Sequence, residues 1–202
     1  GGRLVNGYTG RYSTELTVNG GVEMLSNTVS EVDAGSSDFK ISSSYSGPGD
    51  MDLSGSENYY VPSSPSFSGH IEATGTLSLY LRHNGTYTFA PGGSIRVNSG
   101  CRIYQTGYSA TWTVPGGIIL NGGMYRQPSK GTRWTQNSPW IIESASVMQM
   151  DVSGEGYSDI RGPLHGGGAL RLERTAGSLD RAFNFRGSGS TFSNTITFAA
   201  EP

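Results

Sequence analysis

The chain has 202 residues, and only 15% of them are charged, against roughly 25% in an average globular domain. The formal net charge is −2, and arginine and lysine are scattered without a basic stripe. The sequence therefore lacks the positive surface by which nucleic-acid-binding proteins bind phosphates, and we set that class aside. The single cysteine, Cys101, excludes an internal disulfide and a cysteine-based metal cluster, and we expect it to be a small buried hydrophobic residue.

The composition favours an all-β fold. Glycine occurs 31 times, serine, threonine and asparagine are abundant, and lysine occurs only at Lys40 and Lys130. Short alternations of apolar residues, interrupted by Gly, Asn and Ser, are typical of strands and turns. No apolar run reaches the roughly 18 residues of a membrane span, so we expect no direct membrane insertion.

A strand-then-turn phrase recurs along the chain. Its copies are LTVNGG at 16–21, IRVNSG at 95–100 and IILNGG at 118–123. Asn98 and Asn121 are 23 residues apart (121 − 98), about one coil of a β-solenoid, and Asn19 and Asn98 are 79 apart (98 − 19), close to four coils of roughly 20. We expect the aliphatic residues to face a core, and Asn and Gly to turn the chain with positive φ.

A second, longer phrase occurs twice in the same order. The copies are GPGDMDL at 47–53 followed by SFSGHI at 66–71, and GGGALRL at 166–172 followed by TFSNTI at 191–196. These repeats predict a β-solenoid of about nine coils with parallel strands. The alternative is a β-sandwich or jelly roll, because Asn-Gly between alternating apolar residues is also a strong hairpin signal.

The phrases GPGDMDLSG, FSGHI, GTLSLYL, GGGALRL and TFSNTITF resemble the autotransporter-associated β-strand repeat over about half of the chain. The resemblance implies a right-handed parallel β-helix that is displayed on a bacterial surface or secreted, as passenger or stalk. It also implies no fixed catalytic residues, because such repeats are structural.

The repeat pattern lapses at about 125–145, which predicts an irregular excursion from the coils and places function between Tyr125 and Glu143. Four aromatic residues in and near this segment are candidates for binding a sugar ring or a protein partner. These candidate binding residues are Tyr108, Trp112, Trp134 and Trp140. The alternative is that they pack into the core.

Two groups of residues are candidates for catalysis. Asp50 and Asp52 lie two apart in a strand-like phrase and would share one face, as in the acid sites of polysaccharide-cleaving enzymes. Asp159, Arg161 and His165 lie in the glycine-rich stretch GYSDIRGPLHGGG, where they could bind an acidic sugar and move a proton. Each group has a simpler interpretation as solvent-facing or turn residues, and no metal site or cofactor is predicted.

These observations predict a single elongated domain over residues 1–202, part of a longer chain or assembly. The expected function is a non-enzymatic structural or adhesive surface module, secreted or on a cell surface. One alternative is a virion decoration or spike protein, on a virion surface. Another is a carbohydrate-binding or polysaccharide-cleaving β-helix. Expected partners are a surface glycan or protein, and neighbouring copies or domains at the ends of the rod, where strand edges are unpaired.

Overall fold

The computed structural model describes residues 2–5, 14–16, 21–36, 38–41, 43–82, 85–106, 110–127, 133–151, 157–175 and 183–200. Every regular element in these ranges is a β-strand, and every pairing between these strands is parallel. The predicted parallel β-solenoid is therefore confirmed, and the sandwich alternative, which needs antiparallel hairpins, is wrong. The described part of the chain holds no helix long and apolar enough to cross a membrane.

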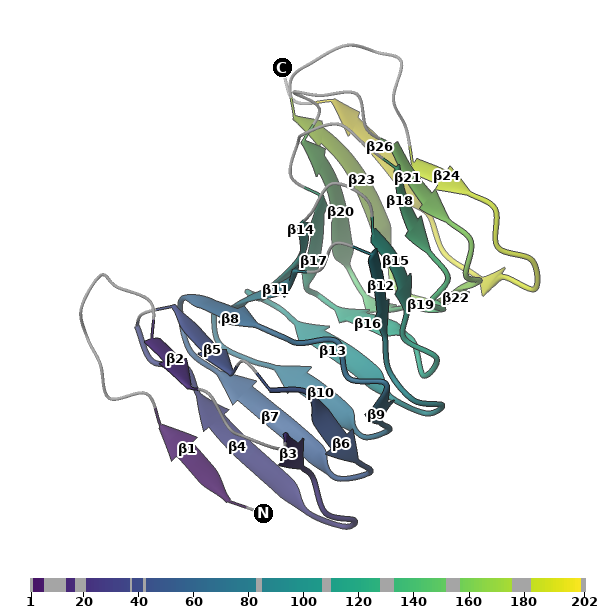
Figure 1. The fold of residues 1–202 in the computed structure, drawn as a ribbon. Helices are drawn as coiled ribbons and strands as arrows, with labels where there is room; N and C mark the ends of the chain where they lie inside the picture. Colours follow the sequence, from purple (N-terminus) through teal and green to yellow (C-terminus); the bar gives the residue numbers. More distant parts are fainter. Residues whose placement is uncertain are drawn as a thin grey trace.

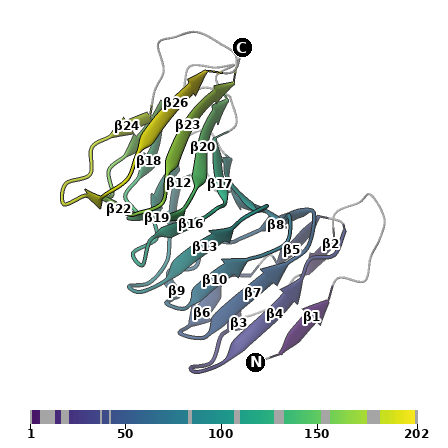
Figure 2. The ribbon, with the colours of Figure 1, turned by 180° about the vertical axis from the view of Figure 1, so that it is seen from behind.

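Two long sheets run the length of the stack (Figures 1 and 2), and each has nine strands in an order that advances by three along the chain. Sheet A consists of β1 (Arg3–Val5), β4 (Val29–Asp33), β7 (Asp50–Ser54), β10 (His70–Ala73), β13 (Ser94–Asn98), β16 (Ile118–Asn121), β19 (Trp140–Ser144), β22 (Leu164–Gly166) and β25 (Thr191–Phe192). Sheet B consists of β2 (Thr14–Leu16), β5 (Phe39–Ile41), β8 (Asn58–Tyr60), β11 (Ser78–Arg82), β14 (Arg102–Thr106), β17 (Met124–Gln127), β20 (Ser146–Asp151), β23 (Leu170–Thr175) and β26 (Ile196–Ala200).

Two shorter sheets complete the third side of the coils. Sheet C consists of β3 (Val22–Glu23), β6 (Tyr45–Gly47) and β9 (Ser66–Phe67). Sheet D consists of β12 (Gly85–Thr88), β15 (Ala110–Thr113), β18 (Arg133–Gln136), β21 (Tyr157–Ile160) and β24 (Phe183–Phe185). One coil is thus a strand of sheet A, the next strand in sheet B, and a strand in sheet C or D.

The core is built from the inward side chains of successive coils, which lie in register. Met51, Ile71, Ile95, Ile118 and Trp140 form one such row across sheet A, and each is fully buried. Because side chains alternate between the two faces of a strand, the residues directly before and after each of these along its strand point outward. The sequence alternation therefore separates the core from the outer faces on which any site must lie.

The number of residues in a coil varies. It ranges from 20 between Met51 and Ile71 (71 − 51) to 28 between Arg3 and Glu31 (31 − 3). The predicted stacking of Asn98 on Asn121 is confirmed, since the two residues are partners in β13 and β16. The predicted spacing of four equal coils back to LTVNGG is wrong, because its Leu16 lies in sheet B whereas IRVNSG begins in sheet A.

In the two described copies of the repeated phrase at 95–100 and 118–123, glycine and not asparagine takes the positive φ. Gly100 and Gly122 have φ of 86° and 79°, as glycine permits. Asn27 is the non-glycine residue with positive φ in the described ranges, so Asn98 and Asn121 remain in extended strands and the expectation of positive φ for them is wrong. Their side chains are free for another role on the outer face.

The two halves of the longer phrase stack on one another. Gly47 is in register with Phe67, and Gly166 is in register with Phe192, so each second half lies one coil beyond its first half. The two copies occupy different corners, since GPGDMDL leads into sheet A and GGGALRL leads into sheet B.

The excursion predicted at 125–145 is wrong for the residues that the structure describes there. Tyr125 pairs with Ile103 and Met148, and β18 and β19 continue sheets D and A. The pattern is obscured because Trp140 takes an inward position that Ile118 and Leu164 hold in the adjacent coils. Residues 128–132 lie outside the described ranges.

Candidate functional site

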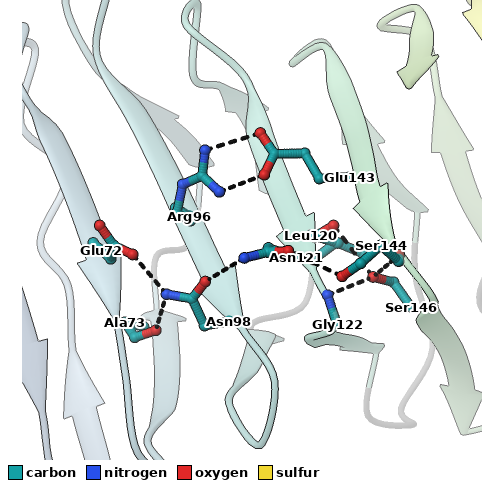
Figure 3. A network of polar contacts seen from close by, with 10 residues as sticks. All are labelled: Glu72, Ala73, Arg96, Asn98, Leu120, Asn121, Gly122, Glu143, Ser144 and Ser146. Atoms are coloured by element: carbon teal, nitrogen blue, oxygen red, sulfur yellow. Dashed lines mark hydrogen bonds and ion pairs between the residues drawn. The ribbon is translucent and has the colours of Figure 1, made fainter. Parts of the chain in front are cut away.

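A row of polar side chains follows the outer face of sheet A where its strands end (Figure 3). Asn98 Nδ2 donates to Glu72 Oε1 at 2.8 Å, and Asn121 Nδ2 donates to Asn98 Oδ1 at 2.9 Å. Ser144 Oγ donates to Asn121 Oδ1 at 3.0 Å. This asparagine ladder, defined as Glu72, Asn98, Asn121 and Ser144, links four successive coils by side-chain hydrogen bonds.

An ion pair spans two coils beside this ladder. The Arg96 guanidinium makes two hydrogen bonds to the Glu143 carboxylate, and it passes over Ile119, which pairs with Arg96 on the intervening strand. The register between β16 and β19 shifts beside this pair, so that Ser144 and not Glu143 is opposite Asn121. The hydrogen bonds to Glu143 raise the pKa of Arg96, which keeps this bidentate pair charged.

The predicted acids Asp50 and Asp52 do share the outer face of sheet A, since Met51 between them is buried. Asp52 is in register with Glu31 and Glu72 on the two neighbouring strands, which forms an acidic row. Burial raises the pKa of Asp52, and the nearby charges of Glu72 and Glu31 raise it further. Among the described residues, neither aspartate pairs with an arginine or lysine, and Asp50 accepts a hydrogen bond from the backbone of His70.

The second predicted catalytic group is not assembled. Asp159 lies in sheet D and His165 in sheet A, where the His165 ring is hydrogen-bonded to Thr191 Oγ1 at 2.7 Å. Asp159 is buried, and its carboxylate contacts Arg161 Nη2 at 3.4 Å and Arg186 Nε at 3.3 Å. An acid held between two arginines, with the imidazole on another sheet, is an ion-pair cluster and not an acid–base pair.

The prediction that Trp112 and Trp140 offer a binding face is wrong. Both are fully buried, and both pack against Tyr125, with ring centroids 6.5 Å and 5.0 Å away. The alternative that these aromatics belong to the core is therefore confirmed for these two residues. The side chain of Trp134 and the whole of Tyr108 lie outside what the structure describes.

The core also holds a polar cluster on the inner side of the coils. Gln136 Nε2 donates to Gln105 Oε1 at 2.6 Å and lies 2.8 Å from Tyr125 Oη. All three residues are fully buried, so this cluster does not present a surface to a ligand, and Gln136 Oε1 is buried without a hydrogen-bond partner.

Sequence reasoning missed a tyrosine ladder on the outer face of sheet B, defined as Tyr60, Tyr80 and Tyr104. The Tyr60 and Tyr80 rings are 5.3 Å apart, and the Tyr80 and Tyr104 rings are stacked at 4.7 Å and 7°. The Arg126 guanidinium lies 5.9 Å from the Tyr104 ring centroid, within the range of a cation–π contact. Tyr80 therefore has an aromatic neighbour on each side, and it is half-buried. The separations of 20 and 24 residues (80 − 60 and 104 − 80) were the signal that could have revealed this ladder.

The described residues contain no group of three or more His, Cys, Asp or Glu side chains that could hold a metal ion. Cys101 is buried, as expected, and burial raises the pKa of its thiol. Comparisons of the chain with protein-family models, with curated proteins and with solved structures gave no match. The parallel β-solenoid and its outer ladders are thus the features from which function is to be argued.

Proposed function

We propose that the chain is a non-enzymatic structural module, a stiff spacer of a secreted or cell-surface assembly, with a virion surface as the alternative setting. One observation carries this proposal: polar and aromatic side chains on the outer faces bond to the next coil along the stack. The asparagine ladder, the tyrosine ladder and the Arg96–Glu143 pair all run parallel to the stacking direction. Each coil of a solenoid contacts only the coils next to it. Side-chain contacts between adjacent coils therefore add to the backbone hydrogen bonds and stiffen the stack.

The length of the stack suits a spacer. Nine parallel strands in one sheet, separated by about 4.8 Å, span about 38 Å. The outer aromatic rings support the same role, because the Tyr80 ring has a tyrosine ring on each side along the stack, so these rings contact neighbouring coils. The resemblance of the repeated phrases to surface-displayed repeats supports the secreted or cell-surface setting.

The experiment sets this proposal against the polysaccharide-cleaving alternative. The purified chain is incubated with neutral and acidic polysaccharides, and the release of reducing ends and unsaturated sugars is measured. We expect no release above buffer, and no difference between the wild type and the variants Asp52→Asn and Asp159→Asn. Release that either substitution abolishes would overturn the proposal.

A further inference from the structure

Two separate demands of the fold place asparagine directly before glycine where β16 ends. The asparagine ladder requires a side-chain amide at Asn121, which donates to Asn98 Oδ1 at 2.9 Å and accepts from Ser144 Oγ at 3.0 Å. The corner requires glycine at Gly122, because its φ is 79° and an added Cβ would lie 3.1 Å from the Ser99 Cβ. Glycine adopts such a φ without strain. The structure therefore imposes the Asn-Gly pair at this corner.

Asparagine followed by glycine readily loses its side-chain amide. The backbone nitrogen of Gly122 attacks Cγ of Asn121, and the new C–N bond closes a succinimide ring while the amide nitrogen leaves as ammonia with the proton of the attacking N–H. Water then opens the ring at either carbonyl and leaves aspartate or isoaspartate, so the reaction consumes one water and needs no oxidant or reductant. Glycine favours the attack because it has no Cβ to crowd the nitrogen. Asn98 is followed by Ser99, so it is the less reactive asparagine of the ladder.

The folded chain engages both reacting groups in other hydrogen bonds (Figure 3). The Gly122 N–H donates to Ser146 Oγ at 3.1 Å, and Ser146 is itself buried. Its hydroxyl lies 3.2 Å from the Leu120 carbonyl oxygen and 2.8 Å from the Ser144 carbonyl oxygen, which fixes the acceptor in place. The Asn121 amide is bonded on both sides within the ladder. Because the attack needs the nitrogen aligned on Cγ, the hydrogen bond to Ser146 and those of the amide must first break.

We propose that Asn121 is a modification site, which stays intact while the ladder is closed and deamidates when the coil around it opens. Local opening of one coil exposes the pair without unfolding the whole stack. The rate of deamidation therefore follows the fraction of time for which this coil is open. This inference goes beyond the spacer function, because it concerns the chemical lifetime of one coil and does not depend on what the stack connects.

The products do not restore the ladder. The carboxylate of an aspartate accepts hydrogen bonds only, so it does not donate to Asn98 Oδ1 and two acceptors then face each other. Isoaspartate lengthens the main chain by one carbon, which disturbs the alternation of inward and outward side chains. Deamidation therefore weakens the contact between two coils permanently. The variant Asn121→Asp, which reproduces one product, is expected to unfold at a lower urea concentration than the wild type.

Peptide mapping by mass spectrometry tests the proposal by following deamidation over time at mildly alkaline pH. The folded chain is compared with the same chain unfolded in guanidinium chloride, and a synthetic peptide of residues 119–124 in both solutions corrects for any direct effect of the denaturant. We expect Asn121 to deamidate about ten-fold or more slowly in the folded chain. In the unfolded chain, Asn121 is expected to react faster than Asn98. Equal corrected rates for Asn121 in the folded and the unfolded chain would overturn the proposal and leave the spacer function standing.

Two variants test whether the hydrogen bonds of the corner give the protection. Ser146→Ala removes the acceptor of the Gly122 N–H, and Ser144→Ala removes the donor to Asn121 Oδ1. We expect each to raise the rate at Asn121 in the folded chain by about three-fold or more. The matched control is Ser193→Ala, which removes a hydroxyl at another corner, where it donates to the Gly166 carbonyl oxygen, and is expected to leave the rate unchanged. Circular dichroism verifies that the variants are folded, and an unchanged rate in both folded test variants would overturn the proposal.

Discussion

Removing one rung of the asparagine ladder gives the sharpest test of what holds the coils together. Asn121→Ala deletes the donor to Asn98 Oδ1 and the acceptor of Ser144 Oγ. Two hydrogen bonds at about 0.5–1.5 kcal/mol each amount to about 1–3 kcal/mol. Because Asn98, Asn121 and Ser144 are half-buried, water can replace part of what is lost. We therefore expect the free energy of unfolding to fall by about 1–2 kcal/mol.

The measurement is the midpoint and slope of urea-induced unfolding, followed by circular dichroism. Asn137→Ala is the matched control, since Asn137 is exposed at a corner and is expected to change stability by less than about 0.5 kcal/mol. The double variant Asn98→Ala/Asn121→Ala adds a coupling energy, for which we expect about 0.5–1.5 kcal/mol. If Asn121→Ala unfolds at the same urea concentration as Asn137→Ala, the ladder does not stabilise the stack.

Three further substitutions test other features by the same unfolding measurement. Gly100→Ala is expected to destabilise the fold by about 1–3 kcal/mol, because φ is 86° and the new Cβ would lie 2.6 Å from the Gly75 carbonyl oxygen. The control Gly167→Ala is expected to be neutral, because its Cβ would meet only Ser193 Oγ, at 3.6 Å. Equal losses of stability in the two variants would refute the role of the Gly100 backbone. Tyr80→Ser removes the middle ring of the tyrosine ladder and is expected to cost about 1–3 kcal/mol, while Tyr80→Phe keeps the ring and should behave as the wild type; a loss in both would shift the cause to the hydroxyl. Asp52→Asn is expected to stabilise at neutral pH, because the raised pKa of Asp52 means that the folded state favours the protonated carboxyl. The gain in stability should disappear as the pH falls below 3.8, the ordinary pKa of the carboxyl, because Asp52 is then protonated in the folded and the unfolded state alike. A gain that persists at this pH would exclude charge repulsion as its cause.

The coil period could be predicted from sequence where two coils carry the same phrase with the same inserts, as at Asn98 and Asn121. The period could not be extended to Asn19, because the coils vary from 20 to 28 residues. A single spacing therefore does not predict which side of a distant coil a residue occupies. The excursion was predicted for a related reason. A tryptophan among polar residues breaks an aliphatic pattern in the sequence, but an inward position also accepts Trp140 when its neighbours leave room.

The outer contacts differ in how far sequence could reveal them. Tyr60, Tyr80 and Tyr104 are each one coil apart and could have been recognised once the coil lengths were known. The Arg96–Glu143 pair could not, because it spans two coils and lies beside a local shift of register. The separation of Asp159 from His165 was hidden for a different reason, since six residues of sequence (165 − 159) here turn a corner from one sheet to another.

The acidic row on sheet A lowers the stability of the stack. Glu31, Asp52 and Glu72 lie on neighbouring strands of sheet A, where like charges repel, so the row costs stability that an alternation of signs would avoid. Asp52→Asn removes the middle charge of this row and is therefore expected to raise the urea midpoint at neutral pH.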